Sequence, residues 1–444
     1  MTDPFPGEPA SVPEPLVRRL GVVGLWAIAL NGTIGAGIFG TPGAAAAETG
    51  IHSPLMFLLC GILMAPIVLS FGAVASRFSS TGGPVLYVQT AFGPFWGFQA
   101  GWTFYVARLS ASAANVALIV TVLERFWPAA AGGATRAGLL LAIAALLTWV
   151  NVVGTQHAMR SVGVLTVAKL VPLLAIVAFG LPALDAAAFP YADTPPPSAE
   201  RIGTAVMLLV YAYVGWESAL VPAGESRAPR RDMPRALLLA LGAATGLYVL
   251  IQAVAVAALP TLAETEGRAL VAVGEALLGP AGAVLLTVGV VVSVGGNVAS
   301  AMLSTPRITY AMARAGTLPR LFGAVHPRFH TPSASIVVYG VLVFALSATG
   351  SFVELAKISV LTRLLIYLGV IGALPKLRGR RAERPADDEA PPFTLPGGPV
   401  IPTVAALVCV ALLLQVSGPT FLRTAAYLAA GSVLYLLARR RPRT

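Results

Sequence analysis

The sequence predicts an all-α integral membrane protein with twelve transmembrane helices, and three observations support this class. Hydrophobic residues make up 57% of the 444 residues and charged residues only 11%. The mean hydropathy of +0.80 is too high for a soluble globular protein. Apolar stretches of about 20 residues, the length that crosses a bilayer, recur along the whole chain. Basic residues gather in alternate loops between these stretches, as in multi-pass membrane proteins.

Twelve apolar stretches can be placed in chain order. A Pro- and Gly-rich segment at 79–95, ahead of the third stretch, predicts a short amphipathic helix. The predicted spans are 20–46, 54–76, 97–123, 136–154, 162–182, 203–224, 236–259, 280–306, 333–348, 352–374, 400–416 and 420–438.

The basic residues predict the orientation of these spans. The loops that follow even-numbered spans carry most of the 30 Lys and Arg residues. Because cytoplasmic loops carry an excess of Lys and Arg, both ends of the chain are expected in the cytoplasm, with the protein in the cell (inner) membrane. The net charge of +11 therefore marks loops beside a lipid bilayer and not a surface for nucleic acid. The opposite loops carry only Arg125, Arg136, Arg201, Arg268 and Arg423.

The chain divides into a large core and smaller parts. Residues 1–17 are Pro-rich and predict a disordered cytoplasmic tail, and residues 18–374 form a ten-helix core. A Pro-, Gly- and charge-rich stretch at 375–399 predicts a flexible cytoplasmic linker. Two further spans at 400–438 and a basic tail at 439–444 complete the chain.

A glycine-crowded sequence interrupts the first span. Residues 31–43 read Asn-Gly-Thr-Ile-Gly-Ala-Gly-Ile-Phe-Gly-Thr-Pro-Gly. Inside a membrane, backbone that leaves the helical hydrogen-bond pattern is tolerated only where it is buried in protein or lines a polar cavity. Such breaks lie near the bilayer midplane in secondary transporters, so the stretch is a candidate binding site.

The sixth span carries an unusual carboxylate. Glu217 follows Val-Tyr-Ala-Tyr-Val-Gly-Trp in apolar sequence. Burial favours the neutral form of a carboxyl group, so protonation at neutral pH is one reading, and a structural tie to backbone N–H groups is the other. Tyr211, Tyr213 and Trp216 form either an aromatic gate over a substrate or ordinary packing.

Several cations also fall within spans. Lys169 in the fifth span needs partners such as backbone carbonyls freed by the break in the first span, or the hydroxyls of Ser300 or Ser304. It is either a proton-coupling group or a permanently charged strut. Together with Arg108, Lys357 and Arg363, counted against Glu217 and Glu354, the spans hold an excess of positive charge, which disfavours a cationic substrate.

Signatures of other functions are missing from the sequence. There is no P-loop, no zinc-ligand spacing and no nucleophile elbow, so neither an enzyme nor a cofactor is expected. Cys60 and Cys409 lie in apolar stretches and predict neither a disulfide nor a metal site. Asn115 and Asn297 are as compatible with ordinary interhelical hydrogen bonds as with a site.

Four motifs in order resemble the amino acid–polyamine–organocation (APC) superfamily of permeases, over about spans 1 to 10. The first is Gly-Ala-Gly-Ile-Phe-Gly at 35–40, and the second is Ser-Thr-Gly-Gly-Pro-Val-Leu-Tyr-Val at 80–88. The third is Val-Gly-Trp-Glu at 214–217, with Glu225 and Pro-Arg-Arg-Asp-Met-Pro-Arg beyond it. The fourth is the segment 304–319, followed by His-Pro-Arg-Phe-His-Thr-Pro at 326–332.

The resemblance implies a LeuT-like fold. Two inverted five-helix repeats, about 18–182 and 203–374, would make the core, with the first and sixth helices discontinuous. The resemblance also implies that Lys169 and Glu217 are proton-coupling residues, and that a cation at Lys169 excludes Na⁺ as the coupling ion. It implies that the substrate is bound at the two breaks, with its carboxylate at the first and its amino group at the second. The residues so implied are Thr33, Ile34, Gly35, Ala36 and Gly37 at the first break, and Tyr211, Ala212, Tyr213, Val214 and Trp216 at the second.

The expected function is secondary active transport of neutral or acidic amino acids by alternating access, through proton symport or exchange. A polyamine or amine antiporter of the same fold and a non-transporting amino acid receptor or scaffold are the alternatives. Arg108, Asn115 and Arg363 are candidates for selectivity. The amino acid and the oligomeric state stay open at this point.

Overall fold

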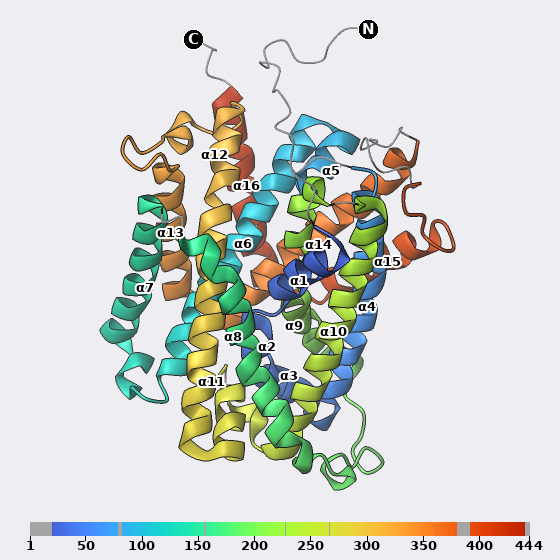
Figure 1. The fold of residues 1–444 in the computed structure, drawn as a ribbon, viewed down its shortest axis with the longest axis vertical. Coiled ribbons are helices and arrows are strands. Elements are labelled where there is room, and N and C mark those ends of the chain that lie inside the picture. Colours follow the sequence, from blue (N-terminus) through green and yellow to red (C-terminus); the bar gives the residue numbers. More distant parts are fainter. Residues whose placement is uncertain are drawn as a thin grey trace.

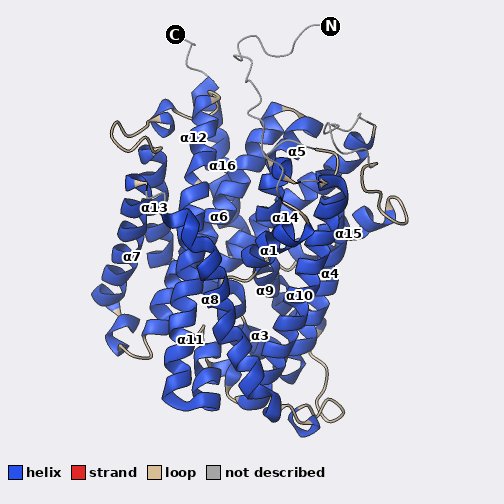
Figure 2. Ribbon diagram, in the orientation of Figure 1, coloured by secondary structure: helices blue, strands red, loops and turns tan. Residues whose placement is uncertain are grey.

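The computed structural model describes residues 20–78, 82–154, 157–226, 228–265, 267–379 and 391–439. Within these ranges the protein is a bundle of helices without a β-strand (Figures 1 and 2). The predicted tail 1–17, residues 380–390 of the predicted linker and residues 440–444 of the basic tail lie outside the described residues. So do residues 79–81 of the predicted amphipathic segment, whose remainder forms α5.

The first half of the chain begins with three short helices in place of one long one. The helices up to the second interruption are α1 (Val22–Thr33), α2 (Ala36–Gly40), α3 (Pro42–Thr49), α4 (Ser53–Ala75), α5 (Gly83–Phe92), α6 (Pro94–Leu123), α7 (Gly133–Val153), α8 (His157–Gly180) and α9 (Ala199–Tyr213).

The second half starts with a 3₁₀ helix, η5 (Trp216–Glu225), directly after the end of α9. It continues with long helices and ends with two helices beyond the linker. These are α10 (Pro229–Ala258), α11 (Ala269–Ser304), α12 (Pro306–Arg314), α13 (Ser333–Thr349), α14 (Phe352–Arg378), α15 (Val400–Leu413) and α16 (Gly418–Arg439).

The helices agree with a multi-pass membrane protein. In the described part of the chain, nine helical segments are long and apolar enough to cross a bilayer. Three shorter apolar helices, Lys169–Ala183, Ser333–Thr349 and Val400–Leu413, lie where three further spans are predicted. The count of twelve spans and the inverted repeat stay predictions.

Helix contacts place the two interrupted regions at the centre of the bundle. α1, α2 and α3 follow one another through the middle of the molecule, beside α9 and α10 (Figure 1). α4 packs on α10, α14 on α6, and α11 on α8. These long helices surround the interruptions with protein, which satisfies the condition for irregular backbone at membrane depth.

Two details differ from the sequence-based expectations. α11 consists of two helices that meet at Gly279, whose φ is +64°; the second agrees with the span predicted from residue 280, and the first, from Ala269, lies outside the predicted spans. Glu354 does not contribute to the interior charge balance, because it is exposed in the first turn of α14, where it forms a capping box with Ser351. Its carboxylate lies 3.6 Å from Arg423 on α16.

Candidate functional site

The first interruption separates α1 from α2 at Ile34 and Gly35. Both residues have extended backbone, with φ and ψ of −74° and 96° at Ile34 and −141° and −150° at Gly35. The N–H groups of Gly35, Ala36 and Gly37 make no backbone hydrogen bond with the described chain outside α2, and the first residues of a helix have no partner inside it. The glycines thus leave a row of free donors at the centre of the bundle.

Two side chains bind the carbonyl groups that α1 leaves free. Lys169 Nζ on α8 donates to the carbonyl oxygens of Asn31, at 2.5 Å, and Ile34, at 2.8 Å. Tyr248 Oη on α10 donates to the carbonyl oxygen of Thr33 at 3.0 Å. The expectation that freed carbonyls meet the Lys169 ammonium agrees with this geometry. The hydroxyl of Ser304 instead accepts a hydrogen bond from Arg108.

The second interruption follows α9. Val214 is extended, with φ −89° and ψ 163°, and Gly215 has a φ of +111°, which strongly favours glycine. The Gly215 N–H donates to Glu217 Oε2 at 2.6 Å, and Ser218 Oγ donates to the Gly215 carbonyl at 2.8 Å. Short-range hydrogen bonds therefore hold the turn between α9 and η5.

The two interrupted segments touch each other through glycine. A Cβ atom on Gly32 would lie 2.3 Å from the Gly215 carbonyl oxygen, and one on Gly37 would lie 2.3 Å from Ala212 Cα. Such distances exclude any side chain at either position unless the backbone moves. The sequence predicts each break separately, but the contact between them joins segments far apart in the chain and depends on the tertiary fold.

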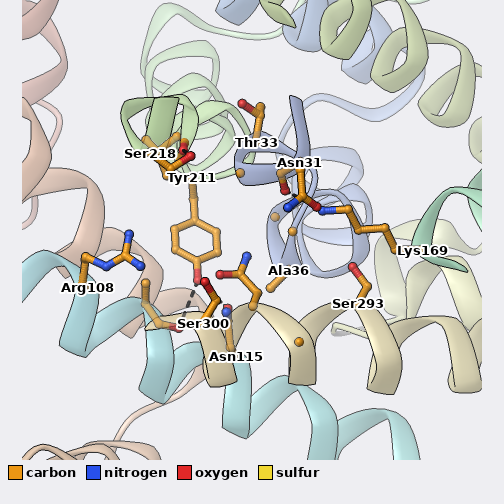
Figure 3. A pocket seen from close by; sticks show the side chains of 18 of the residues that line it. Asn31, Thr33, Ala36, Arg108, Asn115, Lys169, Tyr211, Ser218, Ser293 and Ser300 are labelled. Carbon is orange, nitrogen blue, oxygen red and sulfur yellow. Dashed lines mark hydrogen bonds between the residues drawn. The ribbon is translucent and has the colours of Figure 1, made fainter. Parts of the chain in front are cut away.

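A cavity of about 280 Å³ opens between the interrupted segments, α6, α8, α11 and α14 (Figure 3). Its volume is near the lower end for small-molecule pockets, which suits a small solute. The lining residues are Ile28, Asn31, Gly32, Thr33, Gly35, Ala36, Gly37, Arg108, Ala111, Asn115, Lys169, Tyr211, Val214, Gly215, Ser218, Val292, Ser293, Gly296, Asn297, Ser300 and Arg363.

Tyr211 divides the cavity into two sides. Its hydroxyl donates to Asn115 Oδ1 at 2.7 Å, and its ring packs edge-on against Phe352. Figure 3 shows Arg108 on one side of Tyr211 and Lys169, with the first interruption, on the other. The cavity therefore has a backbone-rich side and an arginine side.

Arg363, which lines the cavity, forms a buried pair with Glu217, which lies outside the lining. Arg363 Nε lies 3.6 Å from Glu217 Oε1, and both side chains are about 5% exposed. Tyr367 Oη also donates to Glu217 Oε1, and Arg363 Nη1 donates to Ser359 Oγ. Glu217 thus links the second interruption to α14.

Not every predicted site residue faces the cavity. Of the candidates at the first break, Thr33, Gly35, Ala36 and Gly37 line it, as do Tyr211 and Val214 at the second. Ile34 contributes its carbonyl to Lys169. Four other candidates lie outside the lining, namely Ala212, Tyr213, Trp216 and Glu217.

The buried aromatic candidates have other contacts. Tyr213 Oη donates to the Phe57 carbonyl at 2.7 Å, away from the cavity. Trp216 packs edge-on against Phe71 and close to Tyr367. These contacts favour packing over a gate for both rings in this conformation.

One wall of the cavity comes from α11, where Asn297 and Ser300 were named from the sequence but Ser293 was missed. Ser293 is 4% exposed and lines the cavity, and its hydroxyl has no hydrogen-bond partner among the described residues. Asn297 lies opposite the first interruption, since a Cβ on Gly35 would be 2.5 Å from Asn297 Nδ2. Helical spacing of small and polar residues, Ser293, Asn297 and Ser300, is the one sequence signal for this wall.

Comparison with known proteins supplies the family. An amino acid permease family model matches residues 20–436. An uncharacterized transporter of Mycobacterium tuberculosis is 32% identical over 98% of this chain and 94% of its own. From Bacillus subtilis, the serine/threonine exchanger SteT is 28% identical over 88% of this chain and 89% of its own. The branched-chain amino acid permease BcaP of the same organism is 24% identical over 96% of this chain and 94% of its own. The resemblance is confirmed, and the chain belongs to the amino acid permease family of multi-pass membrane transporters.

Proposed function

We propose that the protein is a secondary active amino acid transporter of the cell (inner) membrane that works by alternating access. The cavity between the two interrupted helices carries the proposal. Free backbone donors at Gly35–Gly37 suit the substrate carboxylate, and carbonyls at the end of α9, Tyr211–Val214, suit its ammonium group. Thr33 and Ile34, directly ahead of Gly35, complete the proposed carboxylate site.

Relatives support an amino acid as substrate. SteT is described as a serine/threonine exchanger and BcaP as a branched-chain amino acid permease. Another Bacillus subtilis relative, 26% identical, is a methylthioribose transporter, so family membership alone does not define the solute. The free donors at the glycine-rich interruption favour a solute with a carboxylate group.

Proton coupling is proposed to involve Lys169 and Glu217. Lys169 holds two carbonyls of the first interruption, and Glu217 holds the N–H of the second. Gain or loss of a proton at either group changes the contacts that fix its interruption, which links protonation to the conformation of the site. The ammonium of Lys169 repels Na⁺, so a proton or a counter-substrate is the expected driving partner.

The orientation with both chain ends in the cytoplasm is also part of the proposal. α5, α12 and the end of α16 lie at the same end of the molecule (Figure 1). Arg307 and Arg314 of α12 are on this side. The excess of basic residues there agrees with the positive-inside tendency.

The two alternatives find less support. A polyamine antiporter would need a cavity for a cation, whereas Arg108, Lys169 and Arg363 are the Lys, Arg, Asp or Glu residues among the described lining. A receptor would bind an amino acid without moving it.

Purified protein in liposomes tests the proposal. Labelled amino acids should accumulate either under an inward pH gradient or against an internal pool of unlabelled amino acid. Saturable binding without flux would favour the receptor, and neither binding nor flux of any amino acid would overturn the proposal.

A further inference from the structure

We propose that the cavity prefers amino acids with an anionic side chain, and that Arg108 binds the side-chain carboxylate. The inference rests on the proposed function and adds the substrate class. It starts from the ionisable residues of the cavity wall, where the described lining contains Arg108, Lys169 and Arg363 but no Asp or Glu.

The three cations differ in the groups that balance their charge. Lys169 donates to two carbonyl oxygens of the first interruption. Arg363 lies beside the carboxylate of Glu217. Arg108 forms no ion pair with a carboxylate in the described part of the chain, although it lies half-buried in the middle of α6. An anion in the cavity would therefore find at Arg108 a positive charge that no described carboxylate pairs with.

The hydrogen bonds of Arg108 leave part of its guanidinium group free. Nε donates to Thr305 Oγ1 at 2.9 Å, and Nη2 donates to Ser304 Oγ at 3.2 Å. A guanidinium group has five N–H donors in a planar fork that matches a carboxylate. These two hydrogen bonds use one edge of the group and hold its position, so donors on Nη1 and Nη2 remain for a ligand.

A chain of contacts also fixes Arg363 next to Arg108. Ser359 Oγ on α14 accepts from Arg363 Nη1 and donates to the carbonyl of Ala107 at 2.8 Å. Ala107 is the neighbour of Arg108 in α6. The two arginines are therefore held on adjoining helices around one side of the cavity, where their charges act on the same ligand group.

The spacing of the two sides suits one small solute. Asn297 lies opposite the first interruption, and Ser304 contacts Arg108. Ser304 follows Asn297 by seven positions in α11, or about 10 Å along the helix. A solute whose main-chain groups lie at the interruption would direct its side chain past Tyr211 toward Arg108. A neutral side chain would leave the Arg108 charge without a counter-charge, and an anionic one would supply it.

Glutamate and glutamine form the matched pair of probes, because they have the same shape and differ in charge. We expect unlabelled glutamate to inhibit uptake in proteoliposomes at a concentration about tenfold or more below that of glutamine, as loss of one charge-assisted hydrogen bond implies. Equal inhibition, or stronger inhibition by glutamine, would overturn the inference and leave amino acid transport intact. Absence of flux for every amino acid would instead remove the proposed function.

The variant Arg108→Gln separates binding from a structural role. If Arg108 binds the side chain, this variant should lose about tenfold in apparent affinity for glutamate and keep that for glutamine. Arg108→Lys should retain part of the preference, because it keeps the charge but not the fork. The exposed Arg423→Gln is the control and should keep the preference. An equal loss for both probes in Arg108→Gln would show a strut between α6 and α11 and overturn the assignment.

Discussion

At the scale of single residues, Lys169 compensates for the break in α1. An α-helix that ends in the membrane leaves carbonyl groups without partners, and each unpaired buried group costs about 1–3 kcal/mol. Lys169 binds two of these groups, at Asn31 and Ile34, and Tyr248 binds the one at Thr33. Lys169 thus stabilises the end of α1, and the same titratable side chain also lines the cavity.

Replacement of Lys169 by methionine tests its coupling role. Methionine is also unbranched but has no proton to exchange, so Lys169→Met should transport more slowly and should lose the rise in uptake as the external pH falls. Initial rates of uptake in proteoliposomes measure this between about pH 5 and pH 8, the range in which folded proteins tend to be most stable. Lys357→Met is the control, because Lys357 is half-buried on α14 but does not line the cavity. Unchanged pH-dependent uptake in Lys169→Met would reject the role.

The buried pair of Glu217 and Arg363 predicts coupled effects on stability. Removing one partner leaves the other charge buried and uncompensated, at a cost of about 3–5 kcal/mol. We therefore expect Glu217→Gln and Arg363→Met each to lower the unfolding temperature in detergent. The unfolding temperature of the double variant should fall by less than the sum of the two single decreases, because the double variant leaves no unpaired charge. Strict additivity of the three values would contradict a direct interaction.

At the scale of elements, the two interruptions form one unit. Gly32 of α1 meets Gly215 of the second interruption, and Gly37 of α2 meets Ala212 of α9. Close approach of backbone places the free donors of one segment beside the carbonyl end of the other. Glycine is required here by contact, in addition to its backbone freedom at Gly215.

A single added methyl group tests this contact. Gly37→Ala places a Cβ 2.3 Å from backbone that cannot rotate away, so the variant should lose about 1–3 kcal/mol of stability and most of its uptake. Gly246→Ala is the matched control, since a Cβ there meets nothing within 4 Å on the exposed side of α10. It should transport normally. Wild-type uptake by Gly37→Ala would show that the two segments need not touch.

Local sequence predicts the elements better than it predicts their contacts. The glycines of 31–43 predict the first interruption, because so many glycines weaken a helix and irregular backbone in a membrane span must line a cavity or lie within protein. The break in α11 is explained by the local Gly279-Pro280 pair, whereas the helix ahead of it, from Ala269, lies outside the predicted spans. The exposed position of Glu354 follows from a local signal, because Ser351 three residues ahead of it makes a capping-box pattern at the start of an apolar run.

At the scale of the whole molecule, segments far apart in the chain converge on one cavity. α6 brings Arg108, α8 brings Lys169 and α14 brings Arg363, while α11 brings Ser293, whose hydroxyl has no partner in the described part of the chain. The composition predicts that such residues avoid lipid, but not which cavity they share. This convergence is a property of the tertiary fold, and the sequence therefore indicates neutral or acidic amino acids without distinguishing between them, whereas the position of Arg108 favours an anionic side chain.

Protection of the cavity from chemical labelling tests the central claim, that the amino acid binds between the two interruptions. The chain offers a low background, because its two cysteines, Cys60 and Cys409, are both buried. A cysteine at Ser300, which is exposed and lines the cavity, provides the reporter. A cysteine at Ala315, exposed after the end of α12 and outside the lining, provides the control.

The measurement is the rate of maleimide labelling of each variant with and without a transported amino acid. The account predicts that a saturating amino acid slows labelling of Ser300→Cys severalfold and leaves labelling of Ala315→Cys unchanged. Labelling of Ser300→Cys at the same rate in the presence of an amino acid that the variant transports would contradict the account.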